Sequence, residues 1–194
     1  MLMKRAIAAR FTSSAPSKRV LLVWHSRTGF AEQMADALEA GALDAAEQMG
    51  GGLSLARRRA ADATVEDVLR SDAYLFCGPE NLASASGEML EFFHRSYYHA
   101  FAAEGGGGGA EEVSRLLGRP YGLAVAAGSD GTGAARQLER ICRGWRLRPV
   151  ADTVICQNGQ PQTAAAILSP KACPAAARAR CAELGGLLAA TALL

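Results

Sequence analysis

The sequence has few aromatic residues and no excess of charge of either sign. Phe, Trp and Tyr make up 6% of its 194 residues, and its formal net charge is +2. Proteins that bind single-stranded nucleic acid stack bases on aromatic side chains along a basic groove, so this composition argues against a nucleic-acid partner. No apolar run of about 18 residues follows the N-terminal region, so we expect no membrane span.

Metal-binding and disulfide motifs are also missing. The five cysteines are an odd number, no two form a C-x-x-C, and no histidine pair lies near them at zinc spacing. We therefore expect reduced, mostly buried thiols and no metal site. Cys77, the one cysteine near a candidate site, is interpreted as structural, because buried thiols are inert. The histidines are interpreted as structural or surface residues; they are His25, His94 and His99.

The first 19 residues differ in composition from the rest of the chain. They hold five basic residues, three serines and no acidic residue. Such a leader is typical of a mitochondrial or plastid transit peptide; a disordered bacterial N-terminus or a misplaced start codon is the alternative. We expect a mitochondrial or plastid protein in the first case and a cytoplasmic one in the second. Residues 20–194, in a chain that is 49% hydrophobic, are expected to form a single domain.

One stretch, residues 20–31, joins a strand to a helix through a short polar turn. Val20 to Trp24 is strand-like, and the amphipathic helix that begins at Phe30 repeats apolar residues every four positions. The first NH groups of a helix lack intrahelical partners and carry partial positive charge, so this turn is a candidate phosphate cradle. An ordinary helix N-cap explains the same residues.

The pattern of strand followed by helix recurs along the chain. Further strands are predicted over 53–60, 73–77, 121–127 and 150–156, and the last helix over 171–194 with an interruption at Gly185-Gly186. We expect Gly78 and Pro79 to end the strand at 73–77. Crossovers of this length predict a parallel sheet with helices on both faces. Ligands bind such sheets at the carboxyl ends of the strands, where three loops with glycine and hydroxyl residues would meet.

Other glycine- and arginine-rich segments carry weaker signals. Gly128 to Gly133 looks like a dinucleotide fingerprint, but its third glycine is out of register, and the chain has no P-loop. Gly105 to Gly109 is interpreted as a loop insertion. Arg57 to Arg59 is interpreted as a solvated edge, with attraction of a second nucleotide's phosphates as the weaker alternative.

Three segments together resemble the flavodoxin-like FMN-binding family. They are SRTGFAEQMADAL, GPENLASASGEMLEFFHR and AAGSDGTGAARQLERICRGWRLRP, in this order and spacing, and the resemblance covers roughly residues 20–157. Its NAD(P)H-dependent FMN or quinone reductases and its short flavodoxins are the most similar groups. The resemblance implies a doubly wound, five-stranded parallel sheet of order 2-1-3-4-5 in a three-layer α/β/α fold.

The resemblance also implies an FMN site. The FMN phosphate would be held by Ser26, Arg27, Thr28, Gly29, Phe30 and Ala31. The isoalloxazine ring would be flanked on one side by Pro79, Glu80, Asn81, Leu82 and Ala83, and on its other edge by Ala127, Gly128, Ser129, Asp130, Gly131 and Gly133. Two positions depart from the family: Ala31 lacks a hydroxyl group often found there, and Leu82 replaces a frequent aromatic. Glu80 also places a negative charge near the ring, which would disfavour a reduced anionic flavin.

The resemblance implies an enzyme that transfers hydride from NADH or NADPH through FMN to a small-molecule electron acceptor, such as a quinone or a free flavin. A homo-oligomer is a further expectation. No side chain need donate a proton, so no catalytic residue is predicted. The alternatives are a flavodoxin-type electron carrier without NAD(P)H activity and a non-redox binding protein that has lost FMN. Electron carriers of this type usually present a strongly acidic face, so the net charge of +2 favours the reductase.

Overall fold

The structure is a computed structural model that describes residues 17–101 and 114–194. Residues 1–16 of the predicted leader and the predicted loop at Gly105–Gly109 lie outside these residues. The first strand begins at Lys18, two positions before the start expected for the folded domain.

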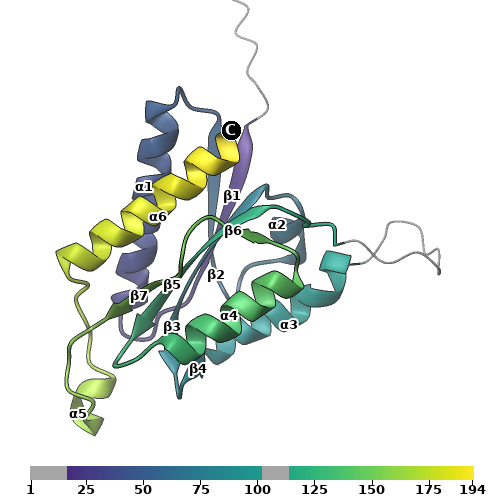
Figure 1. Cartoon of the computed structure of the whole chain (residues 1–194). Helices are drawn as coiled ribbons and strands as arrows, with labels where there is room; N and C mark the ends of the chain where they lie inside the picture. The colour runs from purple at the N-terminus through teal and green to yellow at the C-terminus, as the bar shows by residue number, and fades with distance from the viewer. Residues whose placement is uncertain (1–16, 102–113) are drawn as a thin grey trace, which may run out of the picture.

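A parallel sheet forms the middle layer of the molecule (Figure 1). Its long strands are β1 (Lys18–Trp24), β2 (Leu53–Arg59), β3 (Ala73–Asn81) and β5 (Pro120–Ala127). Two short strands, β6 (Arg148–Pro149) and β7 (Val154–Gln157), both pair in parallel with β5. The order of strands in the sheet is β2-β1-β3-β5, and β6 and β7 lie beyond β5. With β6 and β7 counted as one fifth strand and β4 left out of the numbering, this is the predicted order 2-1-3-4-5. The predicted fold class is confirmed.

Helices cover both faces of the sheet, as expected for parallel strands (Figure 1). One face packs against α1 (Phe30–Gln48) and α6 (Ala175–Leu193), and the other against α2 (Val65–Leu69), α3 (Gly87–Phe101) and α4 (Thr132–Gly144). Alternate residues of β1 point to opposite layers: Val20 and Leu22 to the first, Leu21 and Val23 to the second. Each strand of the centre is therefore buried on both faces.

Aromatic residues of α3 lie at the centre of the second layer. Phe76 of β3 lies 5.0 Å from Phe93 and 6.2 Å from Phe92, and Trp145 packs edge-on against both of these helix residues. Tilted aromatic pairs at such distances add to the stabilisation that burial provides.

Three sequence predictions are wrong in their boundaries. The strand predicted over 150–156 begins only at Val154 and runs to Gln157. The helix predicted over 171–194 begins at Ala175 and runs without a break through Gly185-Gly186. These glycines allow a close helix contact instead: a Cβ at Gly185 would lie 2.0 Å from the carbonyl oxygen of Leu38 in α1.

The third error concerns the end of β3. Gly78 and Pro79 do not end this strand, because both pair with β5. The strand then continues to Asn81 and turns back as β4 (Ser84–Ala85), which is antiparallel to β3. This hairpin projects from the carboxyl edge of the sheet, where the predicted loops lie.

Candidate functional site

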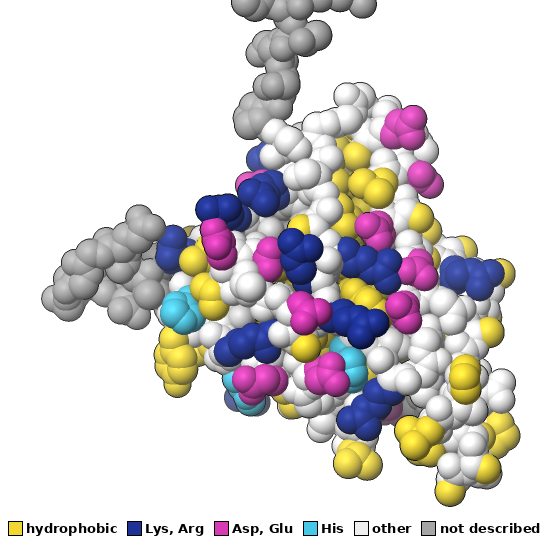
Figure 2. Space-filling view, turned by 180° about the vertical axis from the view of Figure 1, so that it is seen from behind, with side chains coloured by type: hydrophobic (Ala, Val, Ile, Leu, Met, Phe, Trp, Pro, Cys, Tyr) yellow, Lys and Arg dark blue, Asp and Glu magenta, His cyan; other side chains and the backbone are white. Residues whose placement is uncertain are grey.

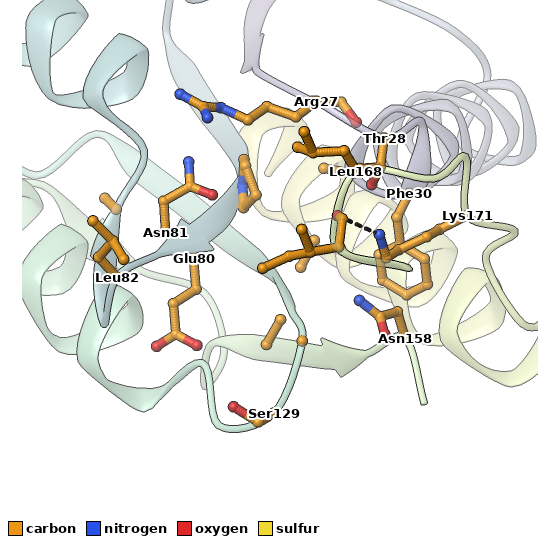
Figure 3. A pocket seen from close by; sticks show the side chains of 18 of the residues that line it. Arg27, Thr28, Phe30, Glu80, Asn81, Leu82, Ser129, Asn158, Leu168 and Lys171 are labelled. Atoms are coloured by element: carbon orange, nitrogen blue, oxygen red, sulfur yellow. Dashed lines mark hydrogen bonds between the residues drawn. The ribbon is translucent and has the colours of Figure 1, made fainter. Parts of the chain in front are cut away.

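A cavity of about 800 Å³ opens at the carboxyl ends of β1, β3 and β5 (Figure 3). This volume lies within the range of about 300–1,000 Å³ that is usual for sites of small ligands and cofactors. The three predicted loops converge there, with Thr28, Asn81 and Ser129 in its wall. Most of the predicted site residues line it: Ser26, Arg27, Thr28, Phe30, Ala31, Pro79, Glu80, Asn81, Leu82, Ala83, Ala127, Gly128 and Ser129.

The loop between β1 and α1 has the geometry of an anion site. Gly29, the N-cap of α1, has φ +82°, a left-handed conformation that favours glycine. Ser26 Oγ accepts a hydrogen bond of 3.1 Å from the Gly29 N–H, so its own proton is free to be donated. The first NH groups of α1, the helix dipole and the exposed Arg27 add positive potential. These groups fit a phosphate, as the sequence predicts.

The hairpin between β3 and β4 holds two residues in an unusual conformation. Leu82 and Ala83 have φ values of 52° and 59°, as in a type I′ turn, where Asn-Gly is the favoured pair. The Leu82 side chain is 100% exposed, so packing does not compensate for the strain. Asn81 Nδ2 is buried and has no hydrogen-bond partner among the described residues. A buried amide donor without an acceptor is costly, so this atom fits a ligand carbonyl or ring nitrogen.

The loop between β5 and α4 is locked to this hairpin. The Gly131 N–H donates to Glu80 Oε2 at 2.9 Å, and Gln137 Oε1 accepts from the Ala85 N–H at 2.9 Å. A Cβ at Gly133 would lie 2.2 Å from the Ala83 carbonyl oxygen. The hairpin and the start of α4 therefore form one wall of the cavity.

Some predicted site residues shape the loops around the cavity without lining it. Gly29 and Gly131 are helix N-caps, Gly133 lies against Ala83, and Asp130 accepts a hydrogen bond from Thr132 Oγ1. The carboxylate of Glu80 has a structural role through Gly131. Its predicted effect on a flavin stays a prediction.

A segment that sequence reasoning missed forms the opposite wall. This segment, residues 158–174, is called the α5 arm, because it carries the short helix α5 (Ala164–Ile167). In Figure 3, Leu168 lies over the cavity, with Asn158 and Lys171 beside it. The residues of the arm that line the cavity are Asn158, Gln162, Ile167, Leu168 and Lys171. Gly159, Pro161, Pro170 and the capping Thr163 are signals that would have indicated a separate loop and helix here.

Hydrogen bonds fasten the C-terminal end of the arm to the start of α1. The Lys171 N–H donates to the Thr28 carbonyl at 2.8 Å. The Gln33 side chain donates to the Lys171 carbonyl at 2.8 Å and accepts from the Cys173 N–H at 3.0 Å. The Lys171 ammonium group donates to three carbonyls at the end of α5, at 2.8 to 3.2 Å. Its charge therefore stabilises the C-terminus of that helix.

His25, just before the candidate phosphate loop, is buried between charged neighbours. Its Nδ1 lies 2.8 Å from Ser86 Oγ, and its Nε2 lies 3.1 Å from a carboxylate oxygen of Glu88. Burial lowers the pKa of His25, Glu88 opposes this, and Arg27 and Arg59 add to it. Because a carboxylate only accepts, we assign the proton of the neutral ring to Nε2 and the acceptor role to Nδ1. Ser86 is completely buried, so its hydroxyl group is not a nucleophile that a substrate could reach. The contacts among His25, Ser86 and Glu88 instead hold the loop between β1 and α1 against α3.

The arginines of β2 lie on a surface of mixed charge. Arg57 contacts Asp36 at 2.6 Å and Glu39 at 3.1 Å, and Arg58 contacts Asp67 at 3.5 Å. Figure 2 shows basic and acidic side chains interspersed over this side of the molecule. These contacts favour the solvated edge over a second nucleotide site.

The described residues contain neither a candidate membrane span nor a candidate metal cluster. In residues 17–101 and 114–194, no helix has the length and apolar character needed to cross a membrane. No cluster of three or more His, Cys, Asp or Glu side chains in the same ranges is arranged to hold a metal ion.

Solved structures with this fold are flavodoxins and related oxidoreductases, although no protein-family model and no curated protein sequence matches the chain. A flavodoxin from the domain Archaea aligns over 91% of this chain and 99% of its own, with TM-score 0.63 and 12% identity. Two-electron reduced Megasphaera elsdenii flavodoxin aligns over 88% and 98%, with TM-score 0.60 and 22% identity. An oxidoreductase from Corynebacterium diphtheriae aligns over 92% and 98%, with TM-score 0.64 and 16% identity. The fold is therefore flavodoxin-like, as the resemblance in the sequence implies.

Proposed function

We propose that this chain, which has the flavodoxin fold, is an FMN-binding flavoprotein. The observation that carries the proposal is the convergence of three predicted loops on one cavity. One end of that cavity offers donors for a phosphate, and the hairpin offers a buried amide donor that has no partner among the described residues.

The phosphate would be held at the N-terminus of α1. Ser26 and Thr28 would donate from their hydroxyl groups, and the NH groups of Phe30 and Ala31 would donate from the backbone. Arg27 supplies the full positive charge that a dianionic phosphate needs. It offsets the missing hydroxyl at Ala31.

The flavin ring would lie between the hairpin and the α5 arm. Asn81 Nδ2 would donate to a polar edge of the ring, and the exposed Leu82 and Leu168 would shield its apolar part from water. FMN, when bound, supplies one- and two-electron redox chemistry. The residues of the chain orient the ring, hold its phosphate and limit the access of water.

Within this class, we propose reduction of a quinone or free flavin at the expense of NADH or NADPH. The net charge of +2 supports this assignment, because a flavodoxin-type carrier docks its partners through a strongly acidic face. The similarity to an oxidoreductase from Corynebacterium diphtheriae agrees with it. The flavodoxins among the similar structures favour the second candidate, an electron carrier.

FMN titration tests the binding proposal. The protein is titrated into FMN and into riboflavin while flavin fluorescence is followed. We expect FMN to bind more tightly, because riboflavin lacks the phosphate. Thr28→Val removes one hydroxyl donor to a charged group, a loss of about 1.5–3 kcal/mol, or roughly tenfold or more in FMN affinity, with riboflavin unaffected. Thr191→Val, on the exposed side of α6, is the matched control. Equal affinity for FMN and riboflavin in all three proteins would reject the phosphate site.

Anaerobic mixing with NADH or NADPH separates the two redox candidates. A reductase bleaches its own flavin absorbance within a turnover, whereas an electron carrier stays oxidised until a reductase partner is added. A protein that takes up no FMN fits neither candidate and leaves a non-redox binding role.

A further inference from the structure

The mouth of the cavity is apolar on two sides. Leu82 on the hairpin is fully exposed, and Leu168 and Ile167 on the α5 arm are 72% and 50% exposed, yet all three line the cavity. Side chains that line a cavity and are also at least half exposed lie at its opening, with Leu82 on the hairpin side and Leu168 on the arm side (Figure 3). Single exposed apolar side chains are ordinary, but three that converge on one opening from two elements indicate a binding surface.

The fold does not need these side chains. Leu82 has φ 52° in a turn where asparagine is favoured, so a leucine there adds strain and gains no packing. Every residue of α5 is at least partly exposed, and the arm is held in place by the polar contacts of Lys171 and Gln33. Backbone strain of this kind gathers at sites that bind ligands, where it is retained for function.

The apolar surface continues from the mouth into the cavity. Leu90 of α3 and the buried Phe30 of α1 also line it. A membrane or a flat protein partner would contact the projecting tips of the hairpin and the arm, but not these inner side chains. A small molecule with an apolar part can contact both. A ligand that enters the cavity therefore fits this surface better than a partner that only covers it.

The charges near the mouth are already engaged. Residues 158–170 of the arm include no charged residue. Among the described residues, the charged ones that line the cavity are Arg27, Glu80 and Lys171. Glu80 accepts from a backbone N–H, the Lys171 ammonium group donates to three carbonyls, and Arg27 is assigned to the phosphate in the proposed function. A charged acceptor would lose water at the mouth without gaining an ion pair, whereas a neutral one would not.

We propose that the electron acceptor is a neutral quinone with an apolar substituent, which Leu82, Ile167 and Leu168 bind at the mouth. The inference rests on the proposed function, because it takes FMN as the cofactor of the cavity. In the overall reaction, NADH or NADPH gives up a hydride with both electrons and the solvent gives a proton. The quinone takes up both and leaves as the hydroquinone. Free FMN or a sulfonated quinone is a poorer substrate, since its charge finds no partner at the mouth.

Equilibrium dialysis measures the contact with the substituent directly. The FMN-loaded protein is dialysed against naphthoquinones that carry a methyl, a propyl or a pentyl group. Each methylene that reaches the apolar mouth should tighten binding about fourfold. A sulfonate at the end of the pentyl group should remove this gain. Equal affinity along the alkyl series would overturn the proposal.

Variants separate binding at the mouth from general partition of apolar compounds into the protein. Leu168→Ser, and Leu82→Asn combined with Ala83→Gly, should each lower the preference for pentyl over methyl severalfold. The double variant suits the turn better than the natural pair, so a loss of binding in it does not come from unfolding. Leu117→Ser is the matched control, because Leu117 is 62% exposed and precedes β5, at the amino end of the sheet and away from the cavity. A preference that survives both mouth variants, or that Leu117→Ser lowers equally, would refute the assignment.

Turnover links the mouth to the reaction. With NADH or NADPH as donor, kcat/KM should rise along the alkyl series in the FMN-loaded protein, and Leu168→Ser should flatten this rise. A rise that is unchanged in Leu168→Ser would count against the proposal.

Other occupants of the mouth are distinguished by assembly. If the mouth variants convert a dimer to a monomer in size-exclusion chromatography, or abolish binding to phosphatidylcholine vesicles, the surface serves a second copy or a membrane and the proposal is overturned. A protein that takes up no FMN strikes the proposed function. In that case a preference for the pentyl compound in the FMN-free protein would leave the apolar mouth standing, and equal affinity would overturn both.

Discussion

Replacing Gly133 with alanine would test whether the start of α4 positions the hairpin that walls the cavity. The added Cβ would lie 2.2 Å from the Ala83 carbonyl oxygen, whereas real Cβ contacts are essentially never shorter than 3.0 Å. The hairpin or the helix must therefore move by about 0.8 Å. The contacted atom belongs to the backbone of a tight turn, so a side-chain rotation cannot relieve it.

The magnitude follows from two opposing effects. Alanine in place of glycine in a helix favours folding by about 1 kcal/mol. Overpacking that displaces backbone costs about 1–3 kcal/mol. We expect Gly133→Ala to lose about 1 kcal/mol of unfolding free energy, or roughly 2–4 °C in Tm for a domain of this size. FMN affinity should also fall, because Asn81 and Glu80 move with the hairpin.

Gly144→Ala is the matched control, because Gly144 ends the same helix and a Cβ there would have no heavy atom within 4 Å. It should gain up to about 1 kcal/mol and leave FMN binding unchanged. Both variants are compared by urea unfolding and by FMN titration. Equal stabilisation by the two substitutions, with FMN affinity intact in both, would show that α4 and the hairpin are not locked together.

Three further predictions concern other parts of the fold. Replacing Leu82-Ala83 with Asn-Gly should raise the unfolding free energy by about 1–2 kcal/mol in urea titrations, because both residues have positive φ and the Leu82 side chain packs on nothing; an unchanged or lower value would contradict a strained type I′ turn. The pKa of His25 is lowered below 6.5 by burial, so the unfolded chain binds a proton that the folded chain does not, and stability should fall as the pH drops through 6.5; His25→Asn should flatten this slope in unfolding measured at several pH values, and an unaltered slope would point to other groups. Gly185→Ala, whose Cβ would lie 2.0 Å from a backbone oxygen of α1, should destabilise the protein far more than Gly186→Ala at 3.3 Å, and thermal melts that rank the two equally would refute the close α1–α6 packing.

The fold could be predicted from the sequence because its main signals are local. Val20 to Trp24 and Ala73 to Cys77 are continuous apolar runs, which indicate strands covered on both faces. The helices between the strands make the connections long enough to require parallel pairing. The carboxyl ends of parallel strands share one edge, so the sequence alone predicts that the loops at Ser26 and Gly128 lie on one rim.

Other features depend on contacts between residues far apart in the sequence. Gly185-Gly186 suggests a helix break by propensity, but Leu38 comes so close that glycine is required inside a continuous helix. Gly78-Pro79 suggests the end of a strand, but pairing with β5 carries the strand on into a hairpin. In the helix, packing outweighs a propensity cost of about 1 kcal/mol for each glycine.

The amino-acid sequence by itself determined the layered sheet and the edge at which three polar loops meet, because periodicity and turn residues act within a few positions of the chain. Only the tertiary structure decided what closes that site. The α5 arm reaches it because Lys171 forms hydrogen bonds with Thr28 and Gln33 at the start of α1. Such pairings join residues that no local pattern connects, so they exist only once the chain is packed.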